Sequence, residues 1–260
     1  MNTLYTVFAA TCVLEVLLIL ILTLLPRLGG VGKDIIETCR KAPILDVILL
    51  VIIWVPWVGG ALLAGWLGVL TSLLGQILVM QLWIFFHELA HSKEAKTPRI
   101  SRFLTQRFGW WRHYLALWAT ALSLPVFFVI RFAEVFIYPL LVWLLEFPAY
   151  DNSEWVTVSR QKFEGLVGHD LIWCLYCDWM TGVYSLGAEM LRNVESFWCP
   201  IRFYDGKKCE NCKIDFPDLE NGWVAIDGTM NDVEEVLKEK YNGPYRSWYG
   251  HPERKQDKPV

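Results

Sequence analysis

The strongest chemical signal in the sequence is a pair of histidines four residues apart with a glutamate between them. The segment reads His87-Glu88-Leu89-Ala90-His91 and follows a long apolar run. On a helix, residues four apart share a face, so both imidazoles can reach one metal ion. Glu88 would project beside them, where it can act as a general base on a metal-bound water. The spacing therefore predicts a zinc site with His87 and His91 as ligands.

This segment resembles the metal-binding helix of integral-membrane zinc metallopeptidases of the prenyl-protease and stress-protease type, over Phe86–Lys93. The resemblance implies that both histidines bind zinc, that Glu88 is the base, and that the reaction is hydrolysis at the cytoplasmic membrane face. These families also have a later glutamate that serves as a third ligand. That motif has no clear match in this chain, and Glu164 and Glu189 are the best-placed candidates, each on a predicted helix.

Other uses of paired membrane histidines fit the sequence less well. Diiron desaturases and hydroxylases need several histidine boxes, whereas this chain has 5 histidines in all. A bis-histidine haem needs a partner histidine inside another span, and His113 lies only at the edge of one. A further interpretation is structural: the His87–His91 segment would then be a polar helix end at the lipid headgroups.

A second candidate metal site is formed by cysteines of the C-terminal part. An odd number of cysteines in a predicted cytoplasmic domain argues against a disulfide framework. Two Cys-x2-Cys pairs favour a thiolate site instead, holding zinc or, as an alternative, an iron–sulfur cluster. The first pair also fits two buried thiols on an amphipathic helix. The predicted ligands are Cys199, Cys209 and Cys212, with Cys174, Cys177 or His169 as the fourth.

Composition divides the chain into two parts. Residues 1–147 carry eleven Lys/Arg and eight Asp/Glu, whereas residues 148–260 carry thirteen and nineteen. The first part is strongly apolar and the second is acidic, which is typical of a membrane domain followed by a soluble domain. The absence of a basic stripe outside the loops excludes a nucleic-acid-binding protein. Phosphate-binding loops and nucleophile elbows are also absent.

Three apolar stretches are long enough to reach the membrane. A spanning helix needs about 20 apolar residues. The run from Leu4 to Leu25 fits a single retained span. The stretch from Ile44 to Phe86 fits a hairpin that turns near Gly59-Gly60 or Gly65, and Tyr114 to Phe147 fits a second hairpin. Arg131 and Glu134 are expected at the turn of that second hairpin, where they would return to water. The expected number of spans is five, with three as the alternative.

The loops between these stretches predict the orientation. Both basic loops lie on one side if the two longer stretches are hairpins, and the positive-inside rule makes that side cytoplasmic. The N-terminus would then be outside and the C-terminal domain inside. The basic residues are Arg27, Lys33, Arg40 and Lys41 in the first loop, and Lys93, Lys96, Arg99, Arg102, Arg107 and Arg112 in the second.

These patterns predict a mostly α-helical, polytopic membrane protein of the bacterial inner membrane. A membrane domain (1–147) would be followed by a small α-rich, cysteine-containing cytoplasmic domain (148–243) and a flexible tail (244–260). The leading function is zinc-dependent hydrolysis, with membrane lipids and other membrane-complex subunits as expected partners. The alternatives are a non-hydrolytic subunit or assembly factor with a zinc or iron–sulfur site, and a structural membrane adaptor.

Overall fold

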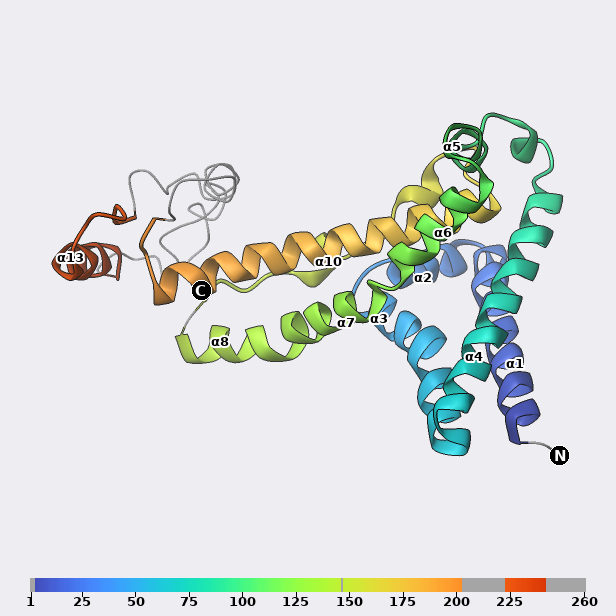
Figure 1. Ribbon diagram of the computed structural model, residues 1–260, viewed down its shortest axis with the longest axis horizontal. Coiled ribbons are helices and arrows are strands. Elements are labelled where there is room, and N and C mark those ends of the chain that lie inside the picture. The colour runs from blue at the N-terminus through green and yellow to red at the C-terminus, as the bar shows by residue number, and fades with distance from the viewer. Residues whose placement is uncertain (1–2, 146, 203–222, 242–260) are drawn as a thin grey trace. The chain divides into compact units, whose positions relative to one another are not determined.

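The computed structural model describes residues 3–145, 147–202 and 223–241 and is mostly helical (Figure 1). This confirms the predicted fold class. Within these ranges there is no strand, and the β contacts are the isolated bridges Lys41–Thr157 and Ile201–Val224. The helical elements are α1 (Thr3–Leu24), η1 (Leu25–Leu28), α2 (Gly30–Cys39), α3 (Ile44–Leu49), η2 (Leu50–Trp54), α4 (Val55–Ala90), η3 (Glu94–Lys96), α5 (Ile100–Phe108), α6 (Trp110–Ala121), α7 (Leu124–Phe132), η4 (Ala133–Ile137), α8 (Tyr138–Leu145), α9 (Asn152–Trp155), η5 (Arg160–Lys162), α10 (Gly168–Trp198) and α13 (Met230–Tyr241).

Three helical stretches among the described residues are long and apolar enough to cross a membrane. They are Thr3–Leu28, Ile44–Ala90 and Trp110–Leu145. Most of their large apolar side chains are exposed, as expected for surfaces that face lipid or other membrane helices. These stretches make the protein membrane-associated.

The second stretch folds back on itself, as the sequence predicts. The backbone leaves the helical conformation at Ala64 and Gly65, where Gly65 has a φ of 61°. Contacts between the two legs then follow at one-turn intervals from the reversal. Gly60 faces Gly68, the Ser72 hydroxyl donates to the Pro56 carbonyl at 2.8 Å, and Gln76 Nε2 donates to the Ile52 carbonyl at 2.6 Å. Small residues at the crossing let the two backbones approach closely.

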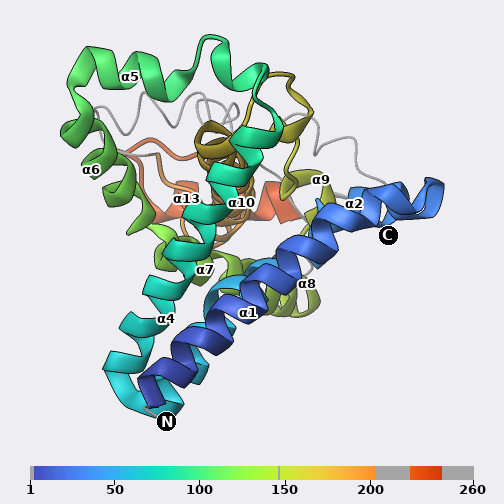
Figure 2. The same ribbon diagram turned by 90° about the vertical axis from the view of Figure 1, so that its right-hand side faces the viewer.

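Helix α1 packs against the second leg of this hairpin. Its buried residues, Val7, Thr11 and Glu15, recur every four positions and form one stripe. Thr11 lies against Gly75, and Gln76 Nε2 donates to Glu15 Oε1 at 3.3 Å. Figure 2 shows that α1 and α4 are closest towards the N-terminal end of α1 and diverge beyond it. A buried polar contact between helices therefore accompanies the packing of small residues.

The predicted turn at Arg131 and Glu134 is wrong. From α7 through η4 to α8 the chain stays helical, and both residues are buried within this run. Arg131 Nη1 and Glu134 Oε2 form an ion pair at 2.7 Å. Because the two charges compensate each other, they do not have to return to water. The η4 segment is π-helical, which widens the helix at this pair.

The chain divides into two compact units. The first contains residues 1–123 and 152–182, and the second contains 124–151 and 183–260. Helix α10 contributes its first half to one unit and its second half to the other, and the domain boundary expected at residue 147 stays a prediction. The predicted flexible tail at 244–260 lies outside the described residues.

Two helices of the C-terminal part follow from patterns in the sequence. The helix expected from His169 towards Phe197 is α10. The helix expected after Thr229 is α13, and its N-terminus is capped as the sequence indicates. Asp232 Oδ2 accepts hydrogen bonds from the Thr229 backbone N–H at 2.6 Å and from its hydroxyl at 2.7 Å.

Candidate functional site

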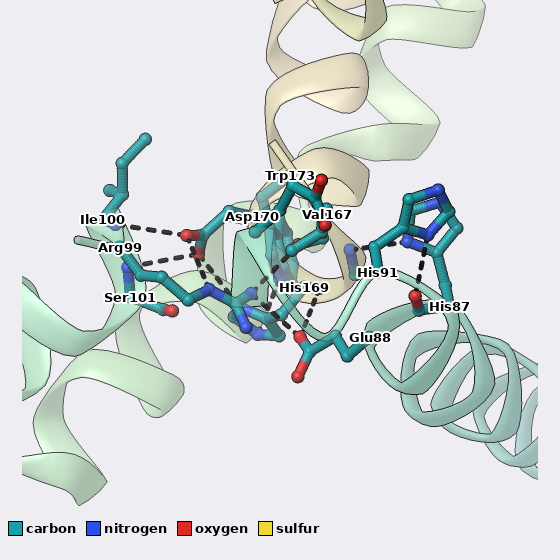
Figure 3. Close-up of polar contacts among 12 residues, drawn as sticks. His87, Glu88, His91, Arg99, Ile100, Ser101, Val167, His169, Asp170 and Trp173 are labelled. Carbon is teal, nitrogen blue, oxygen red and sulfur yellow. Dashed lines mark hydrogen bonds and ion pairs between the residues drawn. The ribbon is translucent and has the colours of Figure 1, made fainter. Parts of the chain in front are cut away.

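The His87–His91 segment forms the end of α4 and lies in the first unit. Ala90 is the last helical residue, and His91 has left the helical conformation with a φ of −109° and a ψ of 48°. His87 and Glu88 contact the first residues of α10, and Glu88 also contacts Arg99, the residue that precedes α5 (Figure 3). The site therefore joins three chain segments that are far apart in the sequence.

Glu88 is held by a cation. Its Oε1 lies 2.8 Å from Arg99 Nη2 and also accepts a hydrogen bond from the His169 backbone N–H at 3.3 Å. The Arg99 side chain is only 9% exposed. An ion-paired carboxylate is stabilised in its charged form, which makes it a weaker proton acceptor.

Asp170 completes the ion-pair cluster on the other side of Arg99. Its Oδ2 lies 3.3 Å from Arg99 Nε. The same carboxylate accepts hydrogen bonds from the backbone N–H groups of Ile100 and Ser101, both at 3.1 Å. These are the first residues of α5, so Asp170 caps that helix from α10. Arg99 also donates to the Val167 carbonyl at 2.9 Å.

The two histidines make different hydrogen bonds. The Gly168 backbone N–H donates to His87 Nδ1 at 3.2 Å, so this nitrogen is unprotonated and a neutral ring carries its proton on Nε2. His91 Nδ1 lies 2.9 Å from the His87 carbonyl, which only accepts, so this nitrogen is protonated. The rings stack at 4.3 Å between centroids. His91 Nε2 is therefore available as a ligand, whereas in a neutral His87 ring Nδ1 accepts from Gly168 and Nε2 carries the proton.

Gly168 allows the start of α10 to approach Glu88. It has a φ of 51°, a backbone conformation that residues with a Cβ atom rarely adopt. A Cβ atom at this position would also lie against the Glu88 side chain, 2.7 Å from Cδ. The glycine is thus required both by the backbone conformation and by the space around it.

A second polar cluster lies next to the first, around His169. The indole N–H of Trp173 donates to His169 Nε2 at 3.0 Å. The His169 ring lies 6.4 Å from that of buried His113, whose Nδ1 is 2.9 Å from the Thr105 hydroxyl. Burial lowers the pKa of His169, and this effect is opposed by Asp170 and reinforced by His113 and Arg99. His169 is thus favoured in its neutral form.

Acidification should destabilise this part of the protein. Since the folded state lowers the pKa of His169, the unfolded chain binds the proton more tightly. The stability is fully present above the unfolded pKa of 6.5 and is lost as the pH falls towards the folded pKa. Melting temperatures between about pH 7.5 and about pH 5.5 should fall more for the wild type than for His169→Gln, whose side-chain oxygen still accepts from Trp173. Equal pH dependence would contradict the assignment.

The two candidate third ligands are not part of this site as described. Glu164 lies in an exposed turn between η5 and α10, so the prediction that it is helical is wrong. The turn precedes Gly165, which has a φ of 91°. Glu189 is on α10 as predicted, but in the second unit, where its Oε2 pairs with Arg192 at 2.7 Å.

The predicted cysteine ligands are described only in part. Cys174 and Cys177 lie on the first turns of α10 in the first unit, and both are partly buried. Cys199 follows the end of α10 in the second unit and is exposed. Cys209 and Cys212 lie outside the described residues. Within the described ranges, no three His, Cys, Asp or Glu side chains gather closely enough to hold a metal ion.

No protein-family model matches the chain, and no curated protein or solved structure is significantly similar to it.

Sequence reasoning missed two residues that organise this site. In the sequence Arg99 has only the pattern of a basic-loop charge, and no motif marks Asp170. Their pairing joins positions that are 71 residues apart, for which a single sequence has no local signal. The available hint was Pro98 followed by Arg99 and a helix without a Ser, Thr, Asp or Asn cap. A helix that lacks its own cap needs an acceptor from elsewhere.

Proposed function

We propose that the protein is a non-catalytic integral membrane subunit or adaptor, in which the His87–His91 segment fastens the end of α4 to α5 and to the start of α10. In this role Glu88 is a structural anion and His87 is a hydrogen-bond acceptor. The proposal concerns the cytoplasmic side of the bacterial inner membrane, following the predicted orientation. Membrane lipids and other membrane subunits are the proposed partners.

The ion pair between Glu88 and Arg99 is the observation that carries this proposal. A general base must be free to take a proton from water, whereas Glu88 lies 2.8 Å from a guanidinium that is nearly buried. His87 supports the same role, because its Nδ1 accepts from Gly168 and its Nε2 carries the proton of the neutral ring. Hydrolysis would require both residues to exchange their present partners.

Zinc-dependent hydrolysis is the second candidate. It is favoured by the two imidazoles, which lie on one face of the helix end, and by His91 Nε2, which has no hydrogen bond to the described residues. In that case Arg99 would have to leave Glu88 when zinc and water bind. Zinc or an iron–sulfur cluster at the C-terminal cysteines is compatible with either candidate and stays a prediction.

Metal analysis of the purified full chain separates the two candidates. The comparison is between the wild type and His87→Ala/His91→Ala, both incubated with zinc and desalted before measurement. A hydrolytic site predicts that the double variant loses about one zinc per chain. The structural role predicts equal zinc content, because any metal at the cysteines is present in both proteins. A difference of one zinc would overturn the proposal.

A stability measurement tests the structural role directly. Glu88→Gln should lower the free energy of unfolding by about 1–2 kcal/mol, because Arg99 loses a charged partner. Once Arg99→Gln is present, Glu88→Gln should cost much less, since the interaction is already gone. The matched control is Glu37→Gln, whose carboxylate is 47% exposed and pairs with Arg40 and Lys162, so water can replace these partners and the effect should be small. Additive effects of the Glu88 and Arg99 changes would contradict a stabilising interaction between these two side chains.

A further inference from the structure

The segment that follows α4 connects two candidate membrane spans. It leaves the candidate span Ile44–Ala90 and, after η3 and α5, enters the candidate span Trp110–Leu145. Asp170 additionally holds the first turn of α5 against α10. Because one residue, Gly109, separates α5 from the candidate span Trp110–Leu145, α5 would lie near the headgroup region when that stretch crosses the bilayer.

The segment presents a concentration of unpaired positive charge. Five of its basic side chains are exposed and have no ion pair to any described residue, and Arg99 is the one used in the site. Glu94 is the only acidic residue between Ser92 and His113. The Arg112 guanidinium lies 5.2 Å from the centre of the Trp111 ring. The exposed basic residues are Lys93, Lys96, Arg102, Arg107 and Arg112.

Large aromatic side chains are exposed among these charges. Phe103 is 65% exposed and Phe108 58%, whereas Trp110 and Trp111 at the start of α6 are 67% and 60% exposed. Interleaved arginine and aromatic residues are typical of helices that lie in the membrane interface. There the aromatic rings enter the boundary between headgroups and acyl chains, and the cations meet phosphate.

We propose that α5 and the Trp110-Trp111 pair form a binding surface for anionic phospholipids. The phosphates of these lipids would contact Arg102, Arg107 and Arg112, and the aromatic rings would insert beside them. Charge complementarity selects this partner, because the segment from Lys93 to Arg112 has five cations without an ion pair to any described residue and a single acid, and such a segment attracts an anionic bilayer. The inference is independent of whether the His87–His91 segment is structural or catalytic.

Binding of short-chain lipids to the full chain in detergent micelles tests whether these arginines give a preference for anionic headgroups. The wild type should bind phosphatidylglycerol in preference to phosphatidylcholine. In Arg102→Gln/Arg107→Gln/Arg112→Gln the affinity for phosphatidylglycerol should fall by about a hundredfold, since each cation near an anionic surface contributes about fivefold. The charge-matched control, Lys33→Gln/Arg160→Gln/Lys238→Gln, removes three cations elsewhere and should keep the preference. Retained preference in the first variant, or equal loss in the control, would overturn the proposal.

Hydrogen exchange of the wild type supplies a measurement that needs no variant. Amides of residues 100–112 should exchange several-fold more slowly in nanodiscs that contain phosphatidylglycerol than in nanodiscs of phosphatidylcholine alone. Amides of α13, which carries a surface ion pair between Lys238 and Glu234, should exchange equally in both. Slowing that is equal in both regions, or absent from residues 100–112, would refute the assignment.

Discussion

Asp170→Ala should unfold the start of α5 and lower the free energy of unfolding by about 3–5 kcal/mol. The substitution removes one of the two carboxylates that neutralise Arg99, whose side chain is 9% exposed. It also leaves the backbone N–H groups of Ile100 and Ser101 without the acceptor that caps them. Thermal melting followed by tryptophan fluorescence should show the loss, and hydrogen exchange should be faster in residues 100–104.

Asp178→Ala is the matched control, because Asp178 lies on the same helix and has the same kinds of partner. It accepts from the Ser159 and Arg160 backbone N–H groups at 2.6 and 3.1 Å and pairs with the Arg160 side chain at 3.6 Å. Arg160 is 43% exposed, so water can replace the lost carboxylate. The expected loss is about 1 kcal/mol. If both variants lost the same stability, the burial of Arg99 would not be the reason for the effect.

Gly68→Ala should open the membrane hairpin. A Cβ atom at this position would clash with the Gly60 carbonyl oxygen and carbon, which are backbone atoms of the opposite leg. Backbone cannot move aside as a flexible side chain can, so the two legs would have to separate. The expected cost is about 3 kcal/mol or more. Separation would also break the contacts that follow the crossing, from Ser72 to Pro56 and from Gln76 to Ile52.

Gly59→Ala provides the comparison for this prediction. Gly59 is also on α4, one residue from the crossing, and a Cβ atom there would meet nothing within 4 Å. Alanine is a better helix former than glycine, so this variant should be as stable as the wild type or slightly more so. Melting temperatures of both variants in the same detergent give the test. A similar loss in both would show that the close approach of Gly60 and Gly68 does not limit the packing.

Much of the fold follows from local pattern. The apolar length of the first two stretches predicts helices that reach the membrane, and the glycines near position 65 predict the reversal between the two legs. The apolar periodicity after His169 predicts α10, and Thr229 with Asp232 predicts the start of α13. The third apolar stretch also reaches span length, but the turn expected within it at Arg131 and Glu134 is wrong. Arg131 and Glu134 look like residues at a turn as long as each charge is considered alone, and their mutual ion pair removes that need.

The His87–His91 segment shows where local pattern stops. Helical periodicity and apolar length establish that Glu88 and both histidines come to the end of a membrane helix, because these properties depend on residues a few positions apart. The state of Glu88 depends on Arg99 and on the backbone of His169, and the state of His87 depends on Gly168. These partners are brought in by chain folding over long sequence separations. A metal-binding spacing and a structural ion-pair cluster therefore look the same in the sequence, because they differ in tertiary contacts such as those of Glu88 and His87.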